Sequence, residues 1–336
     1  MEKLQQSGAE ELGITAIPVP ELPGVLSAWG MHRSGLRMDT VRTLKRISPL
    51  LLKQNITAEQ QLMAAIVIYV LLLKEEGIIM EAKEITIKYI TNAGLLISAG
   101  KTKVLIDGIH SQKVPVFSTV PQEILAKMIT GEGLFKDIAY LLFTHAHKDH
   151  FDPRQTLNYL ANNRVKAVCI SAEGYSLIEN SRTNTGELNT SLIIMKQAYG
   201  KTELVFPDLK IKYFPIPHEG AEFKEVANYG FIISFGAATF LHLGDGSWRD
   251  SSIMESVLKD EQVDYAFLNF PFVNLPQGRL LIKNIIKPKK IFIIHLPNEE
   301  DDLYNYRAIT AKALGRYREV LPEVKVLLDP LEVIKL

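Results

Sequence analysis

From about Glu84 onward, short runs rich in β-branched and aromatic residues alternate with stretches whose apolar residues recur at helical spacing. The runs typical of strands are ITIKYI, GLLIS, KVLID, AYLLFT, KAVCIS, LKIKYF, YGFIISF, ATFLHLG, DYAFLNF and KIFIIHL. The helical stretches are VPQEILAKMI, PRQTLNYLANN, SIMESVLKD and YNYRAITAKALGRYREV. Strand pairs come early and mixed units later. This order predicts an α/β fold with two sheets and helices outside them, a four-layer αβ/βα sandwich.

The composition narrows the cellular setting and the class of partner. The 336 residues contain 38 Lys plus Arg and 38 Asp plus Glu, so no overall field attracts nucleic acid or anionic lipid. The single cysteine, Cys169, lies in the apolar run VKAVCIS, which predicts a buried thiol and a reducing compartment. The first residues lack a signal-peptide pattern, and the longest apolar run, 62–73, is too short for a membrane span. We therefore expect a cytoplasmic protein with a small-molecule substrate and without nucleic acid as a partner.

The first 83 residues do not share the strand-rich pattern. Thr57 and Gln60 form a capping-box signature that predicts a helix through QQLMAAIVIYVLLLKEE, ending at Gly77. Such a helix would be apolar on all sides, so we expect it to be buried or to mediate a homo-oligomer. The expected division is a segment at 1–50, a helical linker at 51–83 and a main domain at 84–336.

The stretch FTHAHKDHFD, residues 143–152, crowds three histidines and two aspartates together. The run AYLLFT brings Thr144 to the end of a strand, and His145 and His147 then share one side of the chain. Asp149 and His150 follow on the opening turn of the next element. Neutral imidazole and carboxylate are ligands for divalent metals, so this crowding predicts two metal ions close together.

Three later positions offer further ligands. His218 in FPIPHEG, Asp245 in FLHLGDG and His295 in IFIIHLP each follow an apolar run and stand beside Gly or Pro. A strand would end there in a loop, where functional groups gather.

Five other polar or aromatic residues near these motifs have weaker assignments. We expect Asp107 to support the site through hydrogen bonds and His242 to be structural. His110 is either a pocket residue or a core residue. Trp248 and Arg249 are either substrate contacts or rim residues.

The order T-H-x-H-x-D-H, a lone His, G-D and a second lone His resembles the metallo-β-lactamase fold superfamily over about residues 84–336. The resemblance implies two metal ions, with zinc first and manganese or iron as alternatives. It places His145, His147 and His218 on one metal, places Asp149, His150 and His295 on the other, and makes Asp245 the bridge. Catalysis would use a hydroxide shared by the metals, oriented by Asp149, with Asp245 as the second catalytic residue.

The segment HAHKDHFD is similar to the lactonase-like members of that superfamily. It favours hydrolysis of a small-molecule ester-like bond in a lactone, thioester or phosphodiester. Two alternatives remain open: a metal-dependent nuclease or phosphodiesterase acting on RNA or DNA, and a non-catalytic metal-bound scaffold. The absence of an evident basic stretch near the motifs disfavours the nuclease.

Residues 9–44 carry a second resemblance. The stretch AEELGITAIPVPELPGVLSAWGMHRSGLRMDTVRTL is similar to a C-terminal piece of the hydantoinase A/5-oxoprolinase family. In that family the piece belongs to a much larger ATP-dependent enzyme. We therefore expect residues 1–80 to be dispensable for the chemistry.

Overall fold

The computed structural model describes residues 84–183, 190–236, 238–249 and 251–336. All of them belong to the second of the two units into which the chain divides, Ala82–Leu336. The predictions for residues 1–83 lie outside the described residues. They concern the resemblance at 9–44, the 51–83 linker and the helix capped at Thr57.

The first of two seven-stranded sheets has the strand order β14-β1-β2-β3-β4-β5-β6. Its strands β1, β2 and β3 form antiparallel hairpins, whereas β3, β4, β5 and β6 run parallel to one another. The strand bounds are β1 Ile85–Thr91, β2 Gly94–Ala99, β3 Thr102–Ile106, β4 Tyr140–Leu142, β5 Ala167–Ile170, β6 Ser191–Ile194 and β14 Val333–Lys335.

The second sheet has the order β13-β12-β11-β10-β9-β8-β7. Here β7, β8, β9 and β10 are antiparallel, and β10, β11, β12 and β13 are parallel. The bounds are β7 Thr202–Val205, β8 Lys210–Pro215, β9 Tyr229–Phe235, β10 Ala238–His242, β11 Tyr265–Asn269, β12 Lys290–Ile294 and β13 Glu323–Val326.

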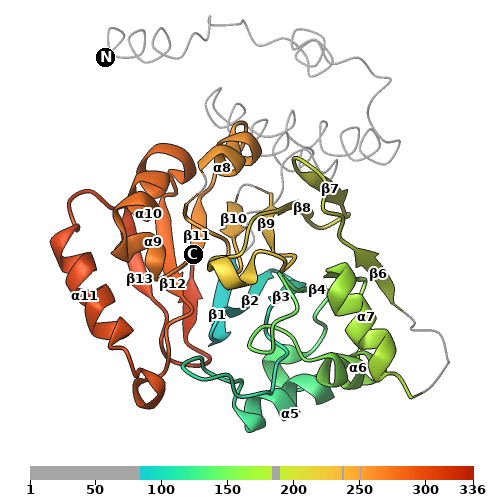
Figure 1. Ribbon diagram of the computed structural model, residues 1–336. Coiled ribbons are helices and arrows are strands. Elements are labelled where there is room, and N and C mark those ends of the chain that lie inside the picture. The colour runs from blue at the N-terminus through green and yellow to red at the C-terminus, as the bar shows by residue number, and fades with distance from the viewer. Residues whose placement is uncertain (1–83, 184–189, 237, 250) are drawn as a thin grey trace, which may run out of the picture. The chain divides into compact units, whose positions relative to one another are not determined.

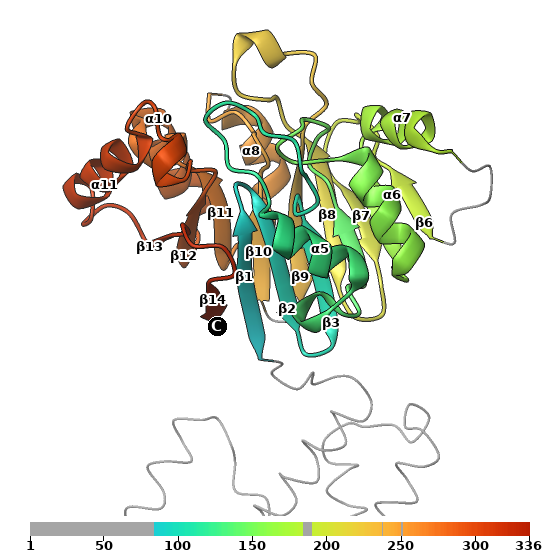
Figure 2. The same cartoon turned by 90° about the horizontal axis from the view of Figure 1, so that it is seen from below.

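Helices cover the outer faces of both sheets (Figures 1 and 2). The green helices α5 Gln122–Thr130, α6 Pro153–Asn162 and α7 Ala172–Ser181 lie on the first sheet, together with the short helix η2 Gly133–Phe135. The orange and red helices lie on the second sheet: α8 Ser251–Leu258, α9 Pro271–Asn274, α10 Pro276–Leu281, η4 Ile282–Ile286 and α11 Tyr306–Arg316. Two further short helices are η3 Ala221–Phe223 and η5 Glu299–Asp301.

Three apolar clusters hold the four layers together. The largest lies between the sheets and joins side chains of the first sheet, such as Ile97, to side chains of the second, such as Phe231. One cluster packs α5, α6 and α7 on the first sheet, and another packs α8 to α10 on the second. Because central strands are covered on both faces, β2 is buried at all six positions and reads as a continuous apolar run. The predicted four-layer αβ/βα sandwich is confirmed.

The elements that the sequence did not predict are mostly at the sheet edges or are short. Strand β7 has no buried position and β13 has none, so neither shows an apolar run. Helices α9 and α10 are four and six residues long, too short for a periodic signal. Helix α7 was not predicted either. It begins after Ser171, whose side chain accepts a hydrogen bond from Gly174 N.

The expectation of a buried thiol at Cys169 is met. Cys169 is a free cysteine in the core, and burial raises the pKa of its thiol to about 12, so it is an unreactive packing residue. Among the described residues, which do not include the apolar run 62–73, no helix is long and apolar enough to cross a membrane.

Candidate metal centre

The His-rich loop is held at both ends. At its start, Thr144 follows β4 and donates two hydrogen bonds to Asp107, which follows β3: N to Oδ1 at 2.8 Å and Oγ1 to Oδ2 at 2.6 Å. At its end, Asp152 caps α6 by accepting from the backbone N–H groups of Arg154 and Gln155. Because β3 and β4 are parallel neighbours, their carboxyl ends meet, and the loop between Thr144 and Asp152 lies at that edge.

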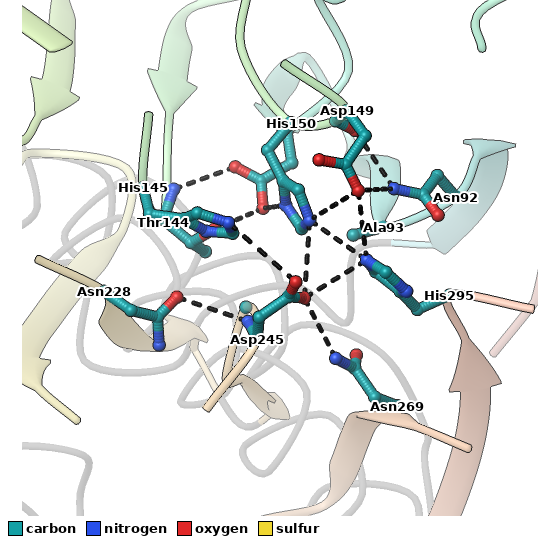
Figure 3. A network of polar contacts seen from close by, with 12 residues as sticks. Asn92, Ala93, Thr144, His145, Asp149, His150, Asn228, Asp245, Asn269 and His295 are labelled. Atoms are coloured by element: carbon teal, nitrogen blue, oxygen red, sulfur yellow. Dashed lines mark hydrogen bonds and ion pairs between the residues drawn. The ribbon is translucent and has the colours of Figure 1, made fainter. Parts of the chain in front are cut away.

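The second sheet supplies the facing residues from the ends of its own strands. His218 follows β8, Asp245 follows β10 and His295 follows β12. An isolated β-bridge between His218 and Gly246 brings the first two loops together. The carboxyl edges of both sheets therefore meet around one cluster of side chains (Figure 3).

Seven side chains form two overlapping groups suited to metal ions. Within each group the nitrogen and oxygen atoms lie no more than 4.8 Å apart. The first group is His145, His147, His218 and Asp245, and the second is Asp149, His150, Asp245 and His295. This is the division that the sequence resemblance implies, with Asp245 shared.

Asp245 stands between the two groups, and each of its oxygens faces one of them. Its Oδ1 lies 3.3 Å from His150 Nε2 and 3.2 Å from His295 Nε2. Its Oδ2 lies 3.5 Å from His218 Nε2 and 3.9 Å from His145 Nε2. One carboxylate thus reaches both sets of imidazoles (Figure 3).

Three of the imidazoles are oriented through Nδ1. His150 Nδ1 lies 2.9 Å from Asp107 Oδ2, and His218 Nδ1 lies 2.7 Å from the carbonyl oxygen of Glu219. His145 Nδ1 lies 3.0 Å from Thr144 Oγ1, whose own hydrogen goes to Asp107, so the hydroxyl accepts from this ring. Such contacts fix the ring and direct Nε2 at the cluster, as they do for metal-binding histidines.

Buried nitrogen atoms without a hydrogen-bond partner indicate that the cluster binds a cation. His145 Nε2 and His218 Nε2 are buried and have no hydrogen-bond partner, although both point toward Asp245. Buried polar atoms of this kind are costly unless a ligand or ion satisfies them. With donors of nitrogen and carboxylate type, the residues present suit a borderline dication.

In the second group, the carboxylates favour positive charge on the imidazoles, whereas burial lowers the pKa of His145 and His147 in the first group. Burial opposes the charge on His295, but Asp245 and Asp149 outweigh it and raise the pKa of His295 to about 9. The same carboxylates, with Asp107, raise the pKa of His150 well above its ordinary value against the effect of burial. For Asp149, burial is opposed by His150 and His295, which lower its pKa on balance.

Two asparagines that the sequence analysis did not single out position the carboxylates. Asn92 Nδ2 donates to Asp149 at the backbone oxygen, 3.0 Å away, and at Oδ2, 3.1 Å away. Asn269 Nδ2 donates to Asp245 Oδ1 at 3.0 Å. Asn269 is the last residue of β11, and a polar side chain at the end of an apolar strand was an available signal. Asn92 lies 57 positions before its partner, and no sequence pattern links the two.

The backbone around the cluster is strained at three non-glycine positions. Asn92, Asp107 and His295 have φ angles of 53°, 43° and 63°, in the left-handed region. The His295 N–H donates to the carbonyl oxygen of Asn92 at 2.8 Å, which ties two of these turns together. Strain of this kind persists where the surrounding structure enforces it, and it concentrates at functional sites.

The structure also shows where the five residues with weaker assignments lie. Asp107 supports the loop through hydrogen bonds, as expected. His242 is structural: its Nδ1 accepts from Gly244 N, and its Nε2 lies 3.1 Å from the Ala93 carbonyl oxygen. His110 is fully buried and does not line the pocket, so the pocket alternative for it is wrong. Trp248 and Arg249 do not line the pocket either, and Arg249 instead donates to Glu219 at its rim.

A pocket with a cavity volume of about 640 Å³ opens onto the cluster. Its lining includes His147, Asp149, His218, Asp245 and His295. Cavities of this size bind small molecules. A ligand in this pocket therefore reaches residues of both groups.

The sequence matches the family model described as the beta-lactamase superfamily domain over residues 102–273. The chain therefore belongs to this superfamily. Divalent metal binding accompanies the fold, in agreement with the two groups of donors. No curated protein sequence matches the chain.

Solved structures agree on the fold. Igni18, a metallo hydrolase from the archaeon Ignicoccus hospitalis, is 17% identical with a TM-score of 0.52, covering 75% of this chain and 98% of that one. The metallo-beta-lactamase fold protein YhfI from Bacillus subtilis is 15% identical with a TM-score of 0.51, covering 75% and 99%. CmlA, a diiron beta-hydroxylase from Streptomyces venezuelae, is 14% identical with a TM-score of 0.54, covering 76% of this chain and 54% of CmlA. This chain thus spans about half of CmlA, and identities this low establish a shared fold alone.

Proposed function

We propose that the protein is a two-metal hydrolase that cleaves a small-molecule ester-like bond, as in a lactone, thioester or phosphodiester. The observation that carries this proposal is the pair of overlapping donor groups, with Asp245 shared and two buried Nε2 atoms unsatisfied. Zinc is the first choice of metal. Manganese and iron are alternatives because ligand type does not separate them, and CmlA is described as a diiron protein.

The residues that would hold the metals are the two groups named above. Bound there, divalent cations would lower the pKa of a water molecule and stabilise negative charge on the substrate oxygen. In the reaction, water adds to the electrophilic carbon or phosphorus, and the bond to the leaving oxygen or sulfur breaks. The net result is one acid group and one alcohol or thiol group, and both remain on one molecule when the substrate is a lactone.

The chain's own groups orient this reaction. Asp149 lines the pocket, and its Oδ2 is fixed by Asn92 at 3.1 Å. Its carboxylate would accept a proton from the attacking water. Asp245, held by Asn269 at 3.0 Å, would keep the imidazoles of both groups facing the same point.

Further parts of the proposal rest on the sequence. The form HAHKDHFD supports a lactonase-like branch. The single Cys169, which allows no internal disulfide, supports a cytoplasmic protein. Residues 1–80 carry none of the seven ligands, so we propose that they affect association more than turnover. A chain beginning at Met80 would keep its rate per site.

A hydrolysis panel tests the class of activity. The zinc-reconstituted full chain is assayed against a γ-lactone, an acyl thioester and bis(p-nitrophenyl) phosphate, beside the same protein treated with chelator. We expect turnover of at least one class, lost in His147→Ala together with metal. Lys148→Ala, one position along the same loop, is the matched control and should retain its metal.

Two results would overturn the proposal. Rates no higher than those of the chelated protein on all three classes would indicate a metal-bound scaffold. Steeply salt-dependent RNA binding with metal-dependent cleavage would indicate a nuclease.

A further inference from the structure

The pocket beside the histidine–aspartate cluster is lined mostly by apolar side chains. Six apolar side chains line it from loops and helices of both halves of the sandwich: Val114, Phe117, Phe151, Leu177, Phe223 and Phe270. Most of these are only partly buried or exposed in the protein, so a ligand can cover their free surface. Apolar surface of this kind gains free energy when an apolar ligand displaces water from it.

Two phenylalanines bring the apolar wall into contact with the histidines. The ring of Phe117 lies edge-on to His295, with centroids 4.3 Å apart. The ring of Phe223 lies against both His147 and His218, at 5.1 Å and 4.8 Å, and is 37% exposed. In Figure 2 the segment carrying Phe223 is the gold loop that projects beyond the ends of the strands. Each group of donors thus has an aromatic side chain next to it.

The turn that places Phe117 is strained. Val116 has a φ of 79°, and the N–H of Phe117 donates to the Val114 carbonyl oxygen at 3.2 Å. A β-branched residue rarely adopts this backbone region, where glycine is usual. The turn therefore holds Phe117 over His295 at a cost in backbone energy, which supports a functional position for the ring.

The charges at the pocket do not suit a phosphate or a polyanion. Apart from the seven cluster residues, the charged side chains among the described residues that line it are Lys148, Glu173 and Glu219. Glu219 is already paired, since it accepts from Arg249 Nε at 2.9 Å and from Ser247 Oγ at 2.7 Å. A single lysine against two glutamates gives no arginine fork or cationic groove for phosphate groups.

We propose that this pocket binds the apolar acyl chain or aromatic ring of an uncharged ester-like substrate, with the scissile bond at the histidine–aspartate cluster. This inference rests on the proposed function. It selects esters, thioesters and lactones with apolar substituents over sugar phosphates and nucleic acids. Phe223 and Leu177 then act as specificity-determining residues.

Calorimetric titration of the zinc-reconstituted full chain with acetate, butyrate, hexanoate and octanoate tests the inference through binding alone. These straight-chain carboxylates differ only in apolar length. We expect the dissociation constant to fall by about twofold to fourfold for each methylene that the pocket buries. Inorganic phosphate and glucose 6-phosphate should bind more weakly than octanoate.

Variants assign the effect to the pocket. Phe223→Ser and Leu177→Ser should each reduce the gain from acetate to octanoate, and Leu177 lies on α7, which carries none of the seven cluster residues. Tyr199→Ser is the matched control, because Tyr199 is fully exposed and does not line the pocket. We expect this variant to keep the full chain-length dependence.

The outcomes separate this inference from the proposed function. Equal affinity for acetate and octanoate, or tighter binding of glucose 6-phosphate, would overturn the apolar pocket even if esters are hydrolysed. A chain-length dependence that persists unchanged in both Phe223→Ser and Leu177→Ser would also overturn it. Binding that follows chain length without hydrolysis of the γ-lactone, the acyl thioester or bis(p-nitrophenyl) phosphate would support the pocket and reject the hydrolase.

Discussion

Two polar clusters join the two sheets at opposite ends of β3 and β4. Asp208, in the turn between β7 and β8, accepts from Thr102 and Tyr140, the first residues of β3 and β4, and from Lys166. The histidine–aspartate cluster lies beyond the other ends of the same strands, where Asp107 and Thr144 stand. The two clusters therefore share a scaffold and differ in chemistry.

The difference is in how completely each cluster is satisfied. Both oxygens of Asp208 have donors at 2.6 to 3.0 Å, and none of the four residues is left with a buried unpaired side-chain atom. In the other cluster, His145 Nε2 and His218 Nε2 are buried without partners. A satisfied network can stabilise the fold by itself, whereas an unsatisfied one indicates a ligand. The comparison thus assigns stability to one end of the sandwich and function to the other.

The largest effect is expected at Asp245, which is shared by both donor groups. Asp245→Ala should remove metal from both and lower kcat/KM by about a thousandfold or more, since several kcal/mol of charge stabilisation would be lost. Metal content per chain and initial rates measure this. Retention of both metals by Asp245→Ala would show that the shared carboxylate is not a ligand.

The next effect concerns the backbone beside that aspartate. Gly244 has a φ of 56°, and a Cβ there would lie 2.5 Å from Asn228 Oδ1 and 2.6 Å from Thr144 Cβ. Gly244→Ala should destabilise the fold by about 2 to 4 kcal/mol through strain and overpacking. Urea unfolding followed by circular dichroism measures the change. Gly200→Ala, also at positive φ but with no atom within 4 Å of the added Cβ, is the control and should cost less.

Asn269→Ala should have a smaller effect, which is confined to metal binding at the histidine–aspartate cluster. The hydrogen bond to Asp245 Oδ1 is lost, and metal affinity should weaken by about 10- to 100-fold, as for other groups that orient metal ligands. Competition with a zinc chelator measures the affinity. An unchanged affinity together with lower stability would make Asn269 a purely structural residue.

Asp208→Asn should act only on stability, by about 1 to 2 kcal/mol, and leave metal affinity unchanged. Burial acts to raise the pKa of Asp208, but hydrogen bonds from Lys166, Tyr140 and Thr102 lower it below 3.8 on balance. A lowered folded-state pKa means that the stabilisation is present above the unfolded value and is lost as pH falls through the folded value.

The difference in unfolding free energy between wild type and Asp208→Asn should therefore be constant near neutral pH and shrink as the pH falls below about 4. Urea titrations at a series of pH values measure it. A difference that grows on acidification would contradict the assignment.

The contrast between the two ends also explains which features the sequence predicted. The candidate ligands of both groups follow apolar runs at the ends of strands, so local patterns were enough to select them. The central strands were visible because both faces are buried.

The contacts that support the candidate ligands and the fold were not predicted, because they join residues that are far apart in the sequence. Asn92 reaches Asp149 across 57 positions, and Asp208 reaches Thr102 across 106. The left-handed backbone at His295 likewise follows from tertiary contacts, since His295 N bonds to Asn92 O. Edge strands such as β7 lack an apolar run because they lie at the periphery.

The central claim is that the unsatisfied cluster holds two divalent metal ions and the satisfied one holds none. Elemental analysis of the full chain after zinc reconstitution and dialysis tests it directly. We expect about two zinc ions per chain in the wild type and in Asp208→Asn, and loss of zinc in His218→Ala. Well under one ion per chain in the wild type, or equal zinc content in wild type and His218→Ala, would contradict it.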